Sequence, residues 1–180
     1  MTHVEDGVTI ELTTGNIVEQ ADVDAIVNAA NAQLRTGGGV AGAIHRAAGP
    51  GLTDETRPLA PIEPGEAVIT GGHDLPNPHV IHVLGPVYGR DTPSDELLRA
   101  GYENALARAE EHGLSSVAFP AISTGAFGFP VDAAARIALH TILDAAPALT
   151  SVALVRFVLF DEETYEAHVE ALTALRSDAS

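Results

Sequence analysis

Short apolar runs alternate with segments of helical pattern along the whole chain, and this alternation narrows the choice of fold more than any other feature. Several of the runs are apolar at successive positions, as in strands buried on both faces of a sheet. Strands are expected at residues 8–12, 25–27, 67–70, 80–84, 117–119 and 152–160. Helices are expected at residues 40–48, 94–112, 131–145 and 162–176. The alternation predicts an α/β domain with helices on both sides of a mainly parallel sheet.

The chain is expected to form one domain over residues 1–180, with a core of about 8–175. Its 180 residues are 46% hydrophobic, and no linker separates two composition regimes. No apolar run is long enough to span a membrane, and the first residues lack the basic and apolar stretches of a secretory signal. Cysteine is absent, which excludes disulfides, thiolate zinc sites and cysteine nucleophiles. We expect a cytoplasmic protein, monomeric and without a membrane partner.

Charge sets a second constraint. Twenty-five acidic residues oppose nine basic residues, all of them arginine, which gives a net charge of −16. Such a surface repels a phosphate backbone, so non-specific nucleic-acid binding is not expected. The acid excess without lysine favours a halophilic protein adapted to molar salt, and an acidic protein from a GC-rich mesophile is the alternative. An anionic ligand would have to be held mainly by backbone N–H groups and helix N-termini.

A glycine-rich segment follows the strand expected at 25–27. It comprises Val27–Asn31 and then Gly37–Arg46, in which three consecutive glycines lead into a helix. Glycines allow the backbone to approach a ligand closely, and the start of a helix offers free N–H donors to an anion. The spacing matches neither the dinucleotide-binding fingerprint nor a P-loop. A merely flexible connection is the alternative interpretation.

Two further loops follow strands and carry small or aromatic residues. The first is in the segment Phe119–Pro130, where a string of N–H groups across Ser123–Phe127 could form a second anion cradle before the next helix. Two of the eight aromatic residues, Phe127 and Phe129, lie in this loop, and the alternative is that both belong to the core. The second is Phe160–Asp161, where an exposed ring could stack on a planar ligand and a buried ring would be part of the core.

Together these segments resemble the macrodomain family, whose members bind ADP-ribose. The motifs Asp24–Asn31, Gly37–Gly49, Val80–Pro86 and Ala118–Gly125 occur in the family's order and spacing. The resemblance covers about residues 8–175 and looks closest to the bacterial and archaeal MacroD-type branch. Members of that branch remove ADP-ribose from acidic side chains and hydrolyse O-acetyl-ADP-ribose. The resemblance implies a three-layer α/β/α fold with a central mixed, mainly parallel sheet, and it implies ADP-ribose as the ligand, with no cofactor.

The resemblance also implies roles for individual residues. Gly37–Gly42 would cradle the phosphate nearer the adenosine side and the distal ribose. Ser123–Phe127 would wrap the other phosphate, with Phe127 packed on the distal ribose. Phe160 would stack on adenine, and Asn31, the expected catalytic residue, would bind the distal ribose near the scissile bond. The residues expected to bind the ligand are Asn16, Ile17, Asn28, Gly37, Gly38, Gly39, Val40, Ala41, Gly42, Ile122, Ser123, Thr124, Gly125, Ala126, Phe127, Phe160 and Asp161.

Two positions depart from the family pattern. Many members have aspartate where this chain has Asn16, and the neutral amide can accept a hydrogen bond from adenine only without charge assistance. The branch that hydrolyses acidic-residue esters has aspartate where this chain has Ala41, and a methyl group cannot orient water. The expected function is still hydrolysis of ADP-ribose esters, on ADP-ribosylated proteins or O-acetyl-ADP-ribose. The alternatives are a non-catalytic ADP-ribose reader and an ADP-ribose-1″-phosphate phosphatase.

The other candidate catalytic residues favour ordinary structural roles. His79 and His82 are three apart on an expected strand and so lie on opposite faces, and no metal site is expected. His45 is expected to be a packed histidine rather than a base. Ser123 and Thr124 lack the nucleophile-elbow sequence, so they are interpreted as phosphate-loop residues.

Lowering the KCl concentration from molar to tens of millimolar is expected to lower the melting temperature. At about 1 M salt the Debye length is about 3 Å, so carboxylates that are screened there repel one another at low salt. Thermal unfolding over a series of KCl concentrations measures the effect. A melting temperature independent of salt would contradict adaptation to molar salt.

Overall fold

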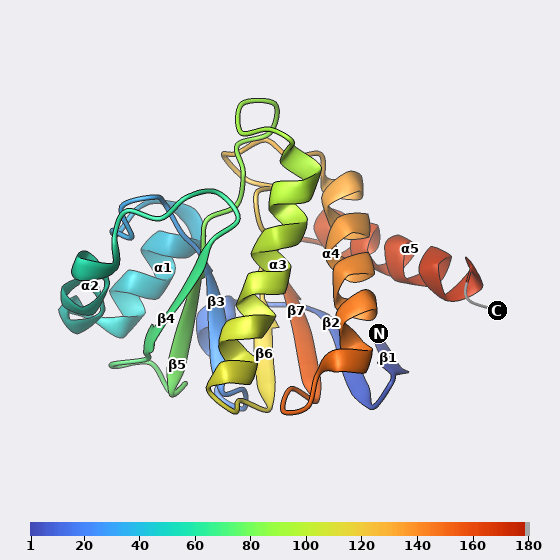
Figure 1. Ribbon diagram of the computed structural model, residues 1–180, viewed down its shortest axis with the longest axis horizontal. Helices are drawn as coiled ribbons and strands as arrows, with labels where there is room; N and C mark the ends of the chain where they lie inside the picture. Colours follow the sequence, from blue (N-terminus) through green and yellow to red (C-terminus); the bar gives the residue numbers. More distant parts are fainter. Residues whose placement is uncertain (179–180) are drawn as a thin grey trace.

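A single seven-stranded sheet forms the centre of the computed structural model, which describes residues 1–178 (Figure 1). The strands are β1 (Thr2–Glu5), β2 (Val8–Thr14), β3 (Ala25–Ala29), β4 (Ala67–Gly71), β5 (His79–Val83), β6 (Ser116–Phe119) and β7 (Leu154–Leu159). Their order across the sheet is β1-β2-β7-β6-β3-β5-β4. The five inner strands are parallel, and β1 and β4 run antiparallel at the two edges. The prediction of a mixed, mainly parallel sheet is confirmed.

Helices cover both faces of this sheet (Figure 1). They are α1 (Gly39–Ala48), α2 (Pro50–Thr56), α3 (Ser94–Glu111), α4 (Val131–Ala145) and α5 (Glu162–Asp178). One face packs on α3, α4 and α5 in a core that includes Tyr102, Phe119 and Phe157. The other face packs on α1 and α2, where Ile44 and Leu52 belong to a second cluster. The three-layer architecture is therefore also confirmed.

Every predicted strand and helix is present within two residues of its expected ends, but two elements were missed. Strand β1 is short and polar, and it pairs only with β2 at the sheet edge, where Val4 is 61% exposed. Helix α2 is only seven residues long and buries just Leu52 and Thr56, so it shows little helical periodicity. None of the helices within residues 1–178 is long and apolar enough to cross a membrane.

The connections after β3 and β6 diverge. These two strands are parallel neighbours, yet the chain leaving β3 enters α1 on one face and the chain leaving β6 enters α4 on the other. A crevice therefore opens between the two connections at the carboxyl edge of the sheet. In open α/β sheets such a divergence is where ligands bind.

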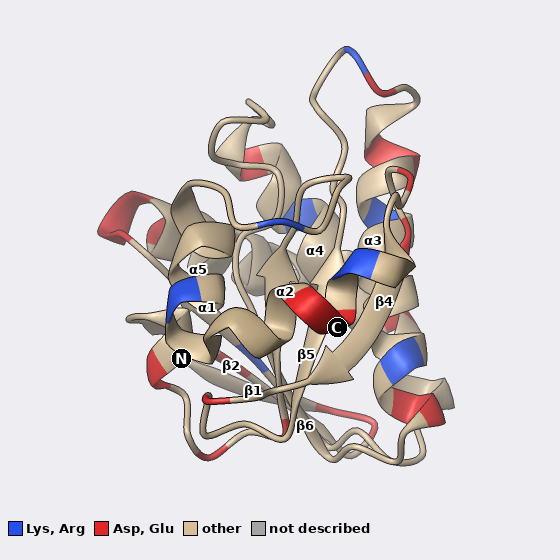
Figure 2. Cartoon of the chain, turned by 90° about the vertical axis from the view of Figure 1, so that its left-hand side faces the viewer, with Lys and Arg blue, Asp and Glu red and all other residues tan. Residues whose placement is uncertain are grey.

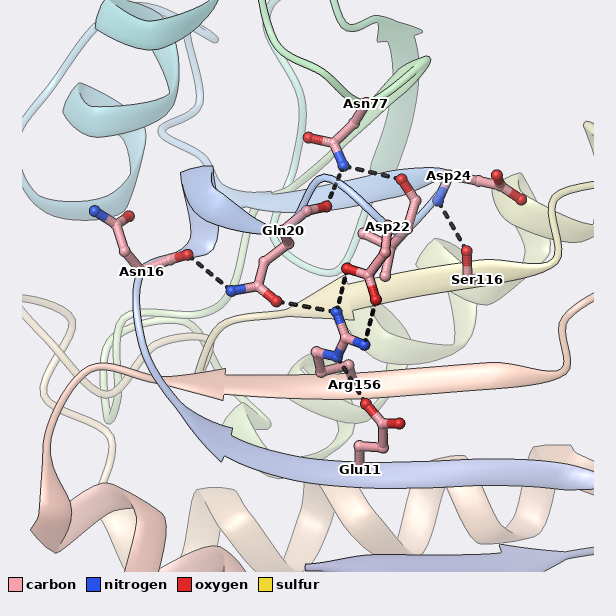
Figure 3. A network of polar contacts seen from close by, with 9 residues as sticks. Glu11, Asn16, Gln20, Asp22, Asp24, Asn77, Ser116 and Arg156 are labelled. Atoms are coloured by element: carbon pink, nitrogen blue, oxygen red, sulfur yellow. Dashed lines mark hydrogen bonds and ion pairs between the residues drawn. The ribbon is translucent and has the colours of Figure 1, made fainter.

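One arginine fastens the connection between β2 and β3 (Figure 3). Arg156 on β7 donates to Glu11 on β2 at 2.7 Å, to both carboxylate oxygens of Asp22 at 2.7 and 2.8 Å, and to Gln20 at 3.1 Å. Gln20 in turn donates to the carbonyl of Asn16 at 3.0 Å. The hydrogen bond from Arg156 lowers the pKa of Asp22. This network holds the segment that carries Asn16 against the sheet.

A line of buried polar groups joins the three strands β3, β5 and β4. His82 is fully buried and accepts from the Asn28 amide at Nδ1, at 3.0 Å. Its Nε2 lies 3.0 Å from the Thr70 hydroxyl, which donates to the Gly71 carbonyl and so accepts from the ring. This pattern fits the neutral imidazole. Burial, with a smaller contribution from nearby His45, lowers the pKa of His82 to about 3.

Acidification is expected to destabilise the fold through His82. Below about pH 6.5 the unfolded chain binds a proton at this histidine that the folded chain does not. This group therefore removes up to about 1.4 kcal/mol of stability per pH unit between about pH 6.5 and 3. Urea unfolding across this range measures the loss, with the exposed His140→Gln as the control variant. An NMR titration showing the His82 ring protonated in the folded protein at about pH 6 would contradict the assignment.

Candidate functional site

A pocket of about 350 Å³ lies at the carboxyl edge of the sheet, in the crevice between the diverging connections. The loops that follow β3, β5 and β6 all contribute to it. Its lining residues are Ala29, Ala30, Asn31, Gly37, Gly38, Gly39, Val40, Ala41, Gly85, Ala121, Ile122, Ser123, Gly125, Ala126 and Phe127. Among these residues, all within the described chain, none has an ionisable side chain, and only Asn31 and Ser123 have polar ones. Polar recognition in this pocket therefore depends mainly on the backbone.

The start of α1 forms one wall. Gly39 opens the helix at a φ of +55°, a left-handed conformation that favours glycine. The N–H groups of Gly39, Val40 and Ala41 are in the first turn and have no acceptor within the helix. They are free to donate to an anion in the pocket.

Gly42 allows this wall to form. A Cβ on Gly42 would contact the carbonyl oxygen of Gly37 and lie 2.9 Å from Nη1 of Arg46. An arginine side chain can move aside, but the Gly37 carbonyl belongs to the loop itself. A glycine at this position therefore lets the loop fold closely over the helix.

The loop after β6 forms the opposite wall and is held at several points. The Ile122 N–H donates to the hydroxyl of buried Tyr102 at 3.3 Å. Ser123, at a φ of +68°, donates through its hydroxyl to the Pro86 carbonyl at 2.8 Å, and its own carbonyl accepts from Phe129 at 2.9 Å. The Ser123 hydroxyl is therefore a structural anchor rather than a free nucleophile.

Gly85, which follows β5 and lines the pocket, packs closely against this second wall. A Cβ on Gly85 would contact the Ser123 hydroxyl oxygen and lie 2.6 Å from Cγ2 of Ile122. The Tyr88 N–H, a few residues farther on, donates to the Phe127 carbonyl at 2.9 Å. The loop after β5 thus fixes the loop after β6 at both ends.

The second wall also presents N–H groups. Within residues 1–178, the N–H groups of Gly125, Ala126 and Phe127 have no hydrogen-bond acceptor in the protein. The N–H groups at the start of α1 line the same pocket from the other side. Two separate sets of backbone donors without a neighbouring carboxylate are suited to an anion with two phosphate groups.

Asn31 lines the pocket beside the first wall, and its amide is hydrogen-bonded to the backbone of the same loop. Its Nδ2 donates to the Arg35 carbonyl at 2.8 Å, and its Oδ1 accepts from the Arg35 N–H at 3.0 Å. One N–H and one oxygen lone pair remain for a ligand. The side chain is thus both a clasp for the loop and a lining group of the pocket.

Most of the residues expected to bind a ligand come together in this pocket, and some do not. The expected residues that line it are Asn31, Gly37, Gly38, Gly39, Val40, Ala41, Ile122, Ser123, Gly125, Ala126 and Phe127. Gly42 lies behind the first wall, and the Thr124 hydroxyl donates to the Ala121 carbonyl at 2.9 Å. Asn28 does not reach the pocket, because its side chain is fully buried and bound to His82.

The residues expected at the adenine end lie outside this lining. Phe160 is 92% exposed, so it is no core residue and its ring is open to a planar ligand. Asp161 caps α5 by accepting from the Thr164 N–H at 2.8 Å, and hydrogen bonds from the side chain and the backbone of Thr164 lower its pKa. Asn16 accepts from the Val18 N–H at 3.1 Å, and Ile17 is buried.

Four lining residues were not expected: Ala29, Ala30, Gly85 and Ala121. Ala30 directly follows β3, and Gly85 and Ala121 lie two residues after the ends of β5 and β6. By contrast, Phe129 is 2% exposed and belongs to the core, as the alternative interpretation held. His45 is likewise packed, with Nδ1 3.1 Å from the Thr53 hydroxyl, and burial lowers its pKa.

Comparison with known proteins identifies the family. A family model described as Macro domain matches residues 27–138. A macro domain-containing protein of Caldanaerobacter subterraneus subsp. tengcongensis is 46% identical over 171 residues, covering 92% of this chain and 97% of the relative. Another macro domain-containing protein, from Streptomyces coelicolor, is 46% identical over 169 residues, and the match covers 91% of this chain and 98% of that relative. The chain belongs to the macro domain family.

Solved macrodomains share the fold of this macro domain. A glycine-to-valine mutant of the Oceanobacillus iheyensis macrodomain, solved with ADPR, superposes with a TM-score of 0.93 at 39% identity and covers 98% of both chains. The Trypanosoma brucei macrodomain in complex with ADP-ribose superposes with a TM-score of 0.84 at 37% identity. That match covers 91% of this chain and 68% of the other.

Proposed function

We propose that this macro domain binds ADP-ribose in the pocket between the loops that follow β3 and β6. The observation that carries the proposal is the pair of backbone donor sets, one from Gly39–Ala41 and one from Gly125–Phe127, which line the same pocket. A diphosphate needs such donors, and a chain of net charge −16 offers few cations to replace them. The ADP-ribose complexes of related macrodomains support this choice of ligand.

The ligand is proposed to lie across the crevice from Phe160 to Asn31. Adenine stacks on Phe160, beside the segment that carries Asn16, Ile17 and Asp161. The two phosphates occupy the two walls of the pocket. The distal ribose packs on Phe127 and hydrogen-bonds to the remaining N–H or lone pair of the Asn31 amide. No cofactor takes part in this arrangement.

We further propose that the bound molecule is an ester of ADP-ribose and that water cleaves it near Asn31. Without an ionisable group in the lining, the protein contributes by positioning the distal ribose and by aiming backbone donors at developing charge. Since no lining side chain can act as a base, a phosphate oxygen of the ligand itself is proposed to accept the proton of the attacking water. The substrates in this proposal are proteins mono-ADP-ribosylated on aspartate or glutamate, and O-acetyl-ADP-ribose.

One observation favours a second function, a reader that binds ADP-ribose without turnover. Ala41 lies in the pocket wall and is 5% exposed, so its methyl group occupies the position where the hydrolytic branch that the chain resembles has aspartate. A methyl group neither orients nor deprotonates water. The rate of ester cleavage distinguishes the two functions.

A protein mono-ADP-ribosylated on glutamate is expected to lose ADP-ribose when it is incubated with this macro domain in molar KCl. Mass spectrometry measures the released ADP-ribose. Asn31→Ala is expected to slow release by about a hundredfold, because the distal ribose is no longer fixed. The control is Asn104→Ala on α3. The Asn104 amide donates to the Gly65 carbonyl, and neither residue lines the pocket.

Two outcomes would revise the proposal. Tight ADP-ribose binding without release, together with release by Ala41→Asp, would identify the wild-type protein as a reader. No shift of the melting temperature at millimolar ADP-ribose would contradict ADP-ribose binding itself, because a ligand that binds the folded state raises that temperature.

Gly42→Ala is expected to weaken ADP-ribose binding by about tenfold, or ~1.4 kcal/mol. The new methyl group would push the Gly37 carbonyl away from α1 and displace the loop that carries the first donor set. Isothermal titration calorimetry measures the affinity. Gly101→Ala is the matched control, because Gly101 is also buried in a helix and its Cβ would meet only Val83, at 3.0 Å. Equal affinities of the two variants would refute the role of the glycine.

A further inference from the structure

A second pocket, of about 470 Å³, lies on the other side of the loop that runs from Asn31 to Gly37. We propose that it binds an acidic segment of the protein that carries the ADP-ribose group. This inference rests on the proposed function, since it assigns the carrier of the ligand to a place beside the ligand's own pocket. The lining residues are Gln33, Leu34, Arg35, Thr36, Thr53, Thr56, Arg57 and Ala60. They come from the loop after β3, from α2 and from the turn that follows α2. Figure 2 views the molecule from the side of α1 and α2.

Charge is the first argument. The chain has nine arginines and no lysine against 25 acidic residues, yet two of the nine line this one pocket. A third, Arg46, is close to the same loop, because the point where a Cβ on Gly42 would stand is 2.9 Å from its Nη1 and in contact with the Gly37 carbonyl. A cluster of cations in so acidic a chain favours an anionic partner.

The arginines of this pocket are also not neutralised within the protein. Arg99, Arg108 and Arg156 each have a carboxylate oxygen at 3.0 Å or less. Within residues 1–178, Arg35 forms no ion pair, and Arg57 reaches only Asp54 at 3.6 Å, with both side chains more than 70% exposed. An exposed pair at that distance contributes little, so both guanidinium groups remain available to a carboxylate.

The walls of the pocket are held in place before any ligand arrives. The buried Thr56 hydroxyl donates to the Leu34 carbonyl at 2.8 Å, which fastens the loop to the end of α2. The Ile62 N–H donates to the Ala32 carbonyl at 3.0 Å and fastens the start of the same loop. A preformed pocket costs less ordering on binding than a flexible surface.

The position of the pocket identifies its occupant. The carrier protein would leave the ADP-ribose site at the distal ribose, beside Asn31, and the Asn31 amide is hydrogen-bonded to the backbone of Arg35. An extended peptide advances about 3.3–3.6 Å per residue, so residues that flank the modified one can reach the pocket. A long polyanion such as a nucleic acid would meet the acidic surface around it, whereas a short acidic segment meets mainly the arginines.

The test compares two peptides joined to ADP-ribose through a linkage that resists hydrolysis. One has glutamates at the flanking positions and the other has glutamines there. The wild-type protein is expected to bind the acidic peptide about fivefold more tightly, and the double variant Arg35→Gln/Arg57→Gln is expected to lose this preference. The control, Arg136→Gln/Arg176→Gln, removes the same charge from α4 and α5 and is expected to keep the preference. Free ADP-ribose is expected to bind all three proteins equally.

Each other outcome overturns the inference. Equal affinity for the two peptides, or a preference that survives in the Arg35→Gln/Arg57→Gln variant, would exclude the pocket as the cause. If the Arg136→Gln/Arg176→Gln control also lost the preference for the acidic peptide, that preference would be due to the overall charge of the protein. A third peptide with phosphoserine at the flanking positions, if it alone were preferred, would reassign the pocket to phosphate. Failure of the wild-type protein to bind free ADP-ribose would instead refute the proposed function.

Discussion

The divergence of two parallel neighbours, β3 and β6, is the constraint on which the site depends. Because their following helices pack on opposite faces, the two connections separate at the carboxyl edge and leave a crevice between them. Each connection then directs backbone N–H groups into that crevice, from the first turn of α1 on one side and from Gly125–Phe127 on the other. In a chain with nine basic and 25 acidic residues, such backbone donors are suited to an anion and require no charged side chain.

The shape of that crevice depends on two glycines, Gly42 behind its first wall and Gly85 in its lining. A Cβ on Gly42 would meet the Gly37 carbonyl, and a Cβ on Gly85 would meet the hydroxyl of Ser123. Neither position is a turn that needs a left-handed backbone; each is a close approach that leaves no room for a side chain. The walls therefore depend on two positions at which the absence of a side chain is what matters.

The sequence predicted most of this architecture, because buried parallel strands and long helices leave strong apolar patterns. It failed at β1 and α2, where pairing with a neighbour or packing of two residues stabilises a segment that has no pattern of its own. The two loops that line the pocket, after β3 and β6, were predicted as a ligand site from their glycines and from resemblance to the macrodomain family. Asn28 was misplaced because residues of a strand alternate between the two faces and its amide binds His82, a contact that depends on strand register and 54 residues of intervening chain. Gly85 was missed because its role is to leave room for Ser123, which no local pattern encodes.

The two hydrogen bonds between the Asn31 amide and the Arg35 backbone link the two pockets. The Asn31 amide lines the first pocket, and through two hydrogen bonds it also fixes the backbone of Arg35, which lines the second pocket. The Asn31 side chain and the Arg35 backbone are therefore held together, within a loop that the Thr56 hydroxyl holds to α2. The lining of the first pocket contains no ionisable group, whereas the second pocket contains two arginines. The loop after β3 contributes to both pockets, so it is where the proposed selection by charge would meet the proposed placement of the ligand.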